Sequence, residues 1–65
     1  MLKPGDKFIQ TWTSTPITFE VLDINEGKDE IRVMCTSYEG YSHEETWDDL
    51  HYVISALRLG DYKMV

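Results

Sequence analysis

The sequence predicts a mainly β (α+β) domain in which short antiparallel strands are followed by one C-terminal helix. Three observations lead to this class. The chain has 65 residues, which suffices for a single small domain spanning 1–65 with a thin core. Turn-forming residues recur about every ten positions, a rhythm typical of short strands. Apolar residues alternate through the first half and follow a helical stripe only near the C-terminus.

Four strands are expected before the helix, at residues 6–12, 17–24, 30–38 and about 41–45. In the second strand, Phe19 and Val21 alternate with polar residues, and the alternation breaks after Val21, where we expect either a bulge or burial on both faces. The third strand places Ile31, Val33 and Cys35 on one side. The turn "NEGKD" joins these two strands in a hairpin, with Gly27 expected to take a positive φ.

The helix is expected at about 47–59. Thr46 and Asp49 have the spacing of a capping box, and Asp48 adds negative charge to the first turn. The apolar stripe consists of Trp47, Leu50, Val53, Ile54 and Leu57. Gly60 should end the helix, and residues 61–65 should form a last strand. The expected order is therefore β-β-β-β-α-β.

Two stretches carry a resemblance to known proteins. The opening "LKPGDKF", followed by an irregular loop and a long hairpin, resembles SH3-like barrels. The ending "TWDDLHYVISALRLGDYKMV" resembles small uncharacterised proteins of bacterial and phage genomes. The resemblance implies a small SH3-like barrel that binds ligands through exposed aromatic residues, and it implies no catalytic residues. The helix is longer than the single turn usual in such barrels, so a five-stranded antiparallel sheet is the alternative.

The charge balance restricts the possible partners. Twelve acidic and six basic residues give a formal charge of −6. Such a surface repels phosphate, so we expect no direct binding to nucleic acid or to anionic membranes. A protein partner with a basic surface is compatible with this charge. The single cysteine permits no intrachain disulfide, and "MLKPGDKF" lacks the apolar segment of a signal peptide, so we expect a cytoplasmic protein.

The segment His43-Glu44-Glu45-Thr46-Trp47 is one residue short of the zinc signature His-Glu-x-x-His. Trp47 replaces the second histidine, and His43 is expected on a strand rather than a helix. A metal-binding protein built on His43 and His51 is therefore the last of three hypotheses, and we expect no metal site and no cofactor. Cys35 is expected to be a small buried hydrophobic residue. We identify no catalytic residues and expect that the protein is not an enzyme.

The candidate partner-binding residues are aromatic and acidic. The aromatic ones are Trp12, Tyr38, Tyr41 and Tyr52, and the acidic ones are Glu44, Glu45, Asp48 and Asp49. Tyrosine and tryptophan often dominate binding energies, and carboxylates would steer a basic partner. The sequence thus favours a small acidic protein-protein interaction module, of the kind expected for a bacterial or phage accessory protein. The alternative is an acidic mimic of nucleic acid that inhibits a basic partner, which requires carboxylates along a ridge. The simplest reading is that the carboxylates maintain solubility and that Trp12 and Tyr41 complete the core.

Overall fold

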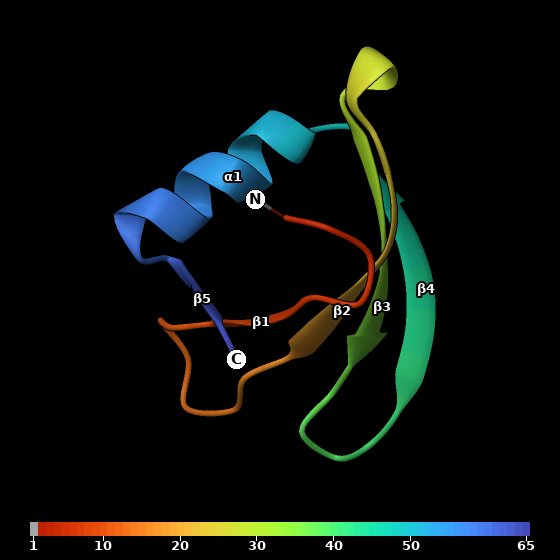
Figure 1. Ribbon diagram of the computed structural model, residues 1–65. Helices are drawn as coiled ribbons and strands as arrows, with labels where there is room; N and C mark the ends of the chain where they lie inside the picture. Colours follow the sequence, from red (N-terminus) through yellow and green to blue (C-terminus); the bar gives the residue numbers. More distant parts are fainter. Residues whose placement is uncertain (1) are drawn as a thin grey trace.

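The computed structural model describes residues 2–65, which form one antiparallel β-sheet with one α-helix lying across one of its faces (Figure 1). The elements are β1 (Lys7–Gln10), β2 (Thr18–Asn25), the 3₁₀ turn η1 (Glu26–Lys28), β3 (Glu30–Thr36), β4 (Ser42–Trp47), α1 (Leu50–Leu59) and β5 (Tyr62–Met64). The mainly β class with five strands and one helix is confirmed. Within the described part of the chain, no helix has the length and apolar character needed to span a membrane.

The sheet is open, so the prediction of a closed barrel is wrong. The strands lie in the order β4-β3-β2-β1-β5, which differs from their succession along the chain. The last strand, β5, pairs with β1, and Gln10 lies opposite Tyr62. Closure would require β4 to pair with β5, but α1 carries the chain from the β4 edge across the sheet to the free edge of β1 (Figure 1).

The hairpin of β2 and β3 forms as expected, but its turn differs. The register shifts between Val21 and Asp23, which confirms the bulge. Gly27 lies in η1 and does not take a positive φ; Asp29 does, with φ of 55°. The Asn25 side chain accepts a hydrogen bond from the Lys28 backbone N–H at 3.2 Å and so closes the turn one step before the left-handed residue. Aspartate tolerates this conformation better than most residues do.

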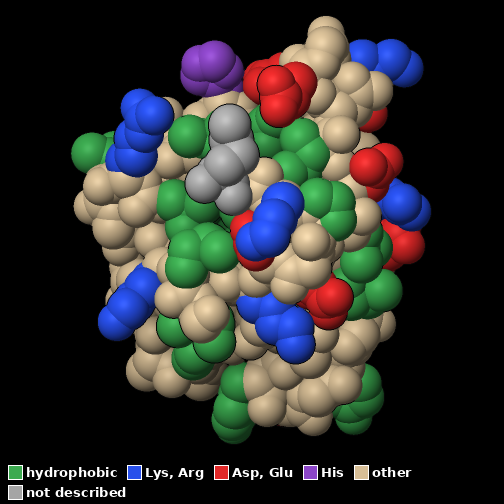
Figure 2. Space-filling view, viewed as in Figure 1, with side chains coloured by type: hydrophobic (Ala, Val, Ile, Leu, Met, Phe, Trp, Pro, Cys, Tyr) green, Lys and Arg blue, Asp and Glu red, His purple; other side chains and the backbone are tan. Residues whose placement is uncertain are grey.

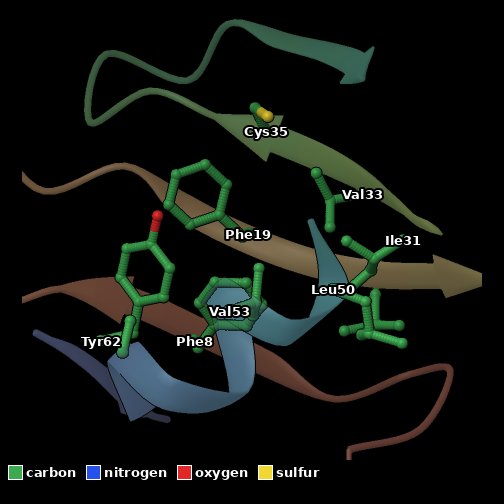
Figure 3. Close-up of a cluster of buried hydrophobic side chains, with 10 residues drawn as sticks. Phe8, Phe19, Ile31, Val33, Cys35, Leu50, Val53 and Tyr62 are labelled. Atoms are coloured by element: carbon green, nitrogen blue, oxygen red, sulfur yellow. The ribbon is translucent and has the colours of Figure 1, made fainter. Parts of the chain in front are cut away.

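The core lies between the inner face of the sheet and α1 (Figure 3). Its buried residues are Phe8, Phe19, Val21, Ile31, Val33, Cys35, Leu50, Val53, Ala56 and Tyr62. The alternation predicted for β3 is confirmed, because Ile31, Val33 and Cys35 are all buried. The helical stripe contributes Leu50 and Val53, as predicted, and the small Ala56 allows close approach to the sheet.

The predicted start of the helix is wrong by one turn. Thr46 lies in β4 opposite Arg32, and Trp47 lies opposite Ile31, so the backbone of both residues belongs to the sheet. The helix begins at Leu50 after the N-cap residue Asp49, whose side chain makes no capping hydrogen bond. The helix ends at Leu59, and Gly60 follows as the C-cap residue with φ of 89°, as predicted. The local capping box therefore does not form.

Asp29, which follows the turn between β2 and β3, caps the start of the helix. Its carbonyl oxygen accepts the Leu50 N–H at 3.0 Å, and its Oδ1 accepts the His51 N–H at 3.0 Å. These are two of the N–H groups that a helix start leaves without intrahelical partners. Because Asp29 satisfies them, the side chains of Asp48 and Asp49 remain free of the helix terminus.

Candidate functional site

Aromatic rings from three separate parts of the chain meet at Tyr62. Trp12 stacks on Tyr62 with ring centroids 5.6 Å apart, and Tyr52 approaches it edge-on at 6.4 Å. The Thr11 N–H donates to the Asp61 carbonyl at 3.0 Å, which ties the end of β1 to the start of β5 and so positions Trp12. Trp12 remains 59% exposed, so it does not complete the core. Tyr62, by contrast, is only 8% exposed and anchors the cluster.

An open cavity of about 510 Å³ adjoins this cluster, and its walls are Trp47, Asp48, Asp49, Tyr52 and Tyr62. The end of β4, the short connection to α1, the first turn of α1 and the start of β5 therefore share one site. Sequence reasoning identified Asp48, Asp49 and Tyr52 as candidates. It assigned Trp47 to the core and did not select Tyr62, although the alternation within residues 61–65 had placed Tyr62 on one face of a strand.

The polar groups of this cavity are available to a ligand. Among residues 2–65, neither Asp48 nor Asp49 forms an ion pair. The Tyr62 hydroxyl makes no hydrogen bond with residues 2–65. No side-chain oxygen in that range is both fully buried and unpartnered, so this hydroxyl must reach solvent. In Figure 3 it points away from α1, beside Phe19. The site thus combines aromatic faces, two carboxylates and one free hydroxyl.

The environment of Tyr62 makes stability depend on pH. Burial raises the pKa of the Tyr62 phenol above its ordinary value of 10.0, and negative charges at Tyr52 and Asp49 act in the same direction. Because the folded pKa lies above the unfolded one, the stabilising contribution is complete below pH 10 and is lost as pH rises through the folded value.

We expect Tyr62→Phe to reduce this alkaline loss of stability, measured by urea unfolding below and above pH 10. The control Tyr38→Phe, at an exposed position, should keep the loss. Equal pH dependence in both variants would contradict the prediction.

Two predicted tyrosines lie outside the cavity. Tyr38 and Tyr41 belong to the turn between β3 and β4 and are 71% and 76% exposed. In an antiparallel sheet this turn and the β1–β2 loop lie at the same end, whereas α1 starts at the other end (Figure 1). Neither of these two rings packs against another ring within residues 2–65. Tyr41 therefore does not complete the core, and neither side chain lines the cavity.

The acidic cluster is divided between the two faces of the sheet. Glu44 and Glu45 are neighbours in β4, so their side chains point to opposite faces. Glu44 accepts a hydrogen bond from Arg32 at 3.2 Å on the outer face. Glu45 lies on the inner face, where it accepts from the Trp47 indole N–H at 2.8 Å and contacts His43 at 2.6 Å. These contacts lower the pKa of the Glu45 carboxyl, with the Trp47 hydrogen bond as the largest cause.

The two histidines lie apart. His51 is at the start of α1, where its ring nitrogen Nδ1 is 3.7 Å from Asp29. His43 lies directly opposite Cys35, near the far end of β3. The six residues from Asp29 to Cys35 correspond to about 20 Å of extended strand, so the two histidines do not share a site. Cys35 is buried, as predicted, and burial, with a smaller effect of the Glu45 charge, raises the pKa of its thiol to about 11.

Comparison with known proteins gives no match to a family model, to a curated protein or to a solved structure. The resemblance to SH3-like proteins therefore stays a prediction. The function must be argued from the geometry of the site itself.

Proposed function

We propose that this protein is a non-enzymatic interaction module that binds a basic segment of a protein partner. The observation that carries the proposal is the cavity in which aromatic rings and unpaired carboxylates meet. Aromatic faces attract cations within about 6 Å of the ring centroid, by about 0.5–2 kcal/mol depending on solvent exposure. Carboxylates beside such rings add direct charge attraction and hydrogen-bond acceptors.

Arginine is the side chain that fits this combination best. Its planar guanidinium stacks on aromatic rings and donates to two acceptors at once, whereas lysine presents a compact, strongly hydrated charge. In the cavity, Trp47 and Tyr52 supply the rings, and Asp48 and Asp49 supply the acceptors. The volume of about 510 Å³ falls within the range of ligand sites, and the open shape suits a side chain that enters from a partner's surface.

The net charge supports the same class of partner. A formal charge of −6 attracts a basic segment at long range and raises the rate of encounter. The exposed Trp12 lies beside the cavity through its contact with Tyr62 and offers further apolar area for such a segment. Tyr38 and Tyr41, in the β3–β4 turn, do not line the cavity and are left for a second contact.

The alternative function, an acidic mimic of nucleic acid, has less support. A mimic requires carboxylates in a continuous row, but Glu44 and Glu45 project from opposite faces of β4. On the face shown in Figure 2, acidic side chains are interspersed with basic and apolar ones. Both arrangements favour a local cation site over an extended acidic ridge.

The proposal can be tested with a short capped peptide in which arginine alternates with glycine. We expect it to shift the NMR signals of the Trp47 indole, Asp48, Asp49 and Tyr52 in the 65-residue chain. A peptide with citrulline in place of arginine keeps the planar shape and part of the N–H donors but lacks the charge. It should bind at least about tenfold more weakly, equivalent to about 1.4 kcal/mol.

Matched variants locate the site. The double variant Asp48→Asn/Asp49→Asn should bind the arginine peptide about tenfold more weakly than the wild type does. The control Glu39→Gln/Glu44→Gln removes the same charge at exposed positions outside the cavity and should change affinity by less than about twofold. If both double variants weaken binding equally, or if the citrulline peptide binds as tightly as the arginine peptide, the cavity is not the cation site.

A further inference from the structure

Cys35, His43 and Glu45 bring three different metal-binding atoms together on the inner face of the sheet. Cys35 lies opposite His43 in the pairing of β3 with β4. Glu45 follows two residues after His43 and therefore points to the same face. The thiol sulfur, an imidazole nitrogen and a carboxylate oxygen all lie within 4.8 Å of one another. This triad arises from strand register and is unrelated to the helical spacing of the zinc signature.

The carboxylate is already oriented toward this point. The Trp47 indole N–H donates to Glu45 Oε1 at 2.8 Å, and the other oxygen, Oε2, lies 2.6 Å from His43 Nε2. A hydrogen bond that holds one carboxylate oxygen while the other faces the ion is the arrangement found around bound metals. Trp47 is itself fixed by the packing of its ring against Phe19 at 5.1 Å.

Small movements would complete the coordination geometry. With bonds of about 2.0–2.3 Å and tetrahedral angles, ligand atoms on zinc are about 3.3–3.6 Å apart. The observed separations bracket these values, since the His43–Glu45 contact is 2.6 Å and the triad extends to at most 4.8 Å. The side chains of His43 and Glu45 are 64% and 45% exposed, so both are free to adjust. Cys35, which is buried, provides the fixed point at the end of the core nearest β4 (Figure 3).

We propose that Cys35, His43 and Glu45 bind one Zn²⁺ ion. Thiolate and imidazole select zinc over magnesium and calcium, which prefer oxygen ligands only. On binding, the Cys35 thiol releases its proton to solvent and the sulfur bonds to the ion. The hydrogen bond between His43 Nε2 and Glu45 Oε2 breaks, and the neutral imidazole and the carboxylate complete three protein ligands. The fourth position of a tetrahedral ion then remains open to water or to a ligand from a partner. This site is independent of the cation cavity, so either proposal can fail without the other.

Cobalt provides the experimental probe, because a Co²⁺–thiolate bond gives a charge-transfer band in the near ultraviolet and tetrahedral Co²⁺ gives intense visible bands. We expect the reduced 65-residue chain to bind one Co²⁺ with both features and to release it to Zn²⁺. Cys35→Ala should lose the charge-transfer band. His43→Gln and Glu45→Gln should each weaken Zn²⁺ binding by at least about tenfold, measured by competition with a chromophoric chelator.

Two controls match these variants in chemistry. His51→Gln removes the other histidine, and Glu44→Gln removes the neighbouring carboxylate on the opposite face of β4. Both should change zinc affinity by less than about twofold, because neither group reaches the triad. His43 and Glu45 are exposed, so their variants should fold even if Cys35→Ala does not. A wild-type cobalt spectrum without a thiolate band, or equal losses in His43→Gln and His51→Gln, would overturn the proposal.

Discussion

Replacing Phe8 by alanine is expected to lower the free energy of unfolding by about 3–5 kcal/mol. Phe8 is fully buried, and its ring packs against Phe19 at 5.2 Å and Tyr62 at 5.1 Å. It lies on β1, which joins β5 to the remainder of the sheet. A domain of this length has a total stability of roughly 3–10 kcal/mol, so the variant should lose at least about a third of it and unfold at room temperature if the total lies near the lower end. Circular dichroism with urea titration measures the loss.

Two further substitutions make this prediction specific. Phe8→Leu keeps an apolar side chain of smaller volume and should cost roughly 1–2 kcal/mol, which stays measurable if Phe8→Ala does not fold. Tyr38→Ala removes an aromatic ring of similar size from an exposed turn and should cost less than about 0.5 kcal/mol. If Phe8→Leu and Tyr38→Ala lose the same small amount, Phe8 does not hold β1 and β5 together.

Alternation and helical spacing predict the parts of this fold that depend on local pattern. Phe19 and Val21 on β2, and Ile31 and Val33 on β3, are buried as their period of two requires. The bulge after Val21 follows from the break in that alternation. Such features are set within a few residues of sequence, and so they can be read without knowledge of the rest of the chain.

Features set by distant partners were not predictable in this way. The spacing of Thr46 and Asp49 suits a capping box, but pairing with β3 holds Thr46 in the sheet and extends β4 to Trp47. Asp29 then supplies the cap from another part of the chain. The pairing of β5 with β1, which leaves the sheet open, likewise depends on where α1 delivers the chain.

The same distinction applies to the two candidate sites. Exposed aromatics and the acidic pair were selected from sequence, but their meeting with Trp47 and Tyr62 depends on how α1 and β5 pack. The triad of Cys35, His43 and Glu45 depends on the register of β3 with β4. A shift of one residue in that register would turn His43 and Glu45 to the outer face and leave Cys35 without them.

The cap provided by Asp29 leads to the second large effect on stability. Asp29→Ala removes the carboxylate that accepts the His51 N–H, which is worth about 0.5–2 kcal/mol at a helix start. It also places alanine at a φ of 55°, which is strained by roughly 1–2 kcal/mol for a residue with a Cβ atom. The combined loss should be about 1.5–4 kcal/mol, because one cost arises from the side chain and the other from the backbone.

Two other substitutions at the same position separate these causes. Asp29→Gly relieves the strain but lacks the acceptor, so it should lose about 0.5–2 kcal/mol. Asp29→Asn keeps an acceptor oxygen and tolerates the left-handed conformation, so its loss should be the smallest of the three. Urea unfolding gives the stabilities, and hydrogen exchange at the His51 amide reports the cap directly. The Asp29→Gly variant could prove no less stable than the wild type, with its His51 amide still protected. In that case the long-range side-chain cap contributes nothing, and the stability lost in Asp29→Ala arises from backbone strain alone.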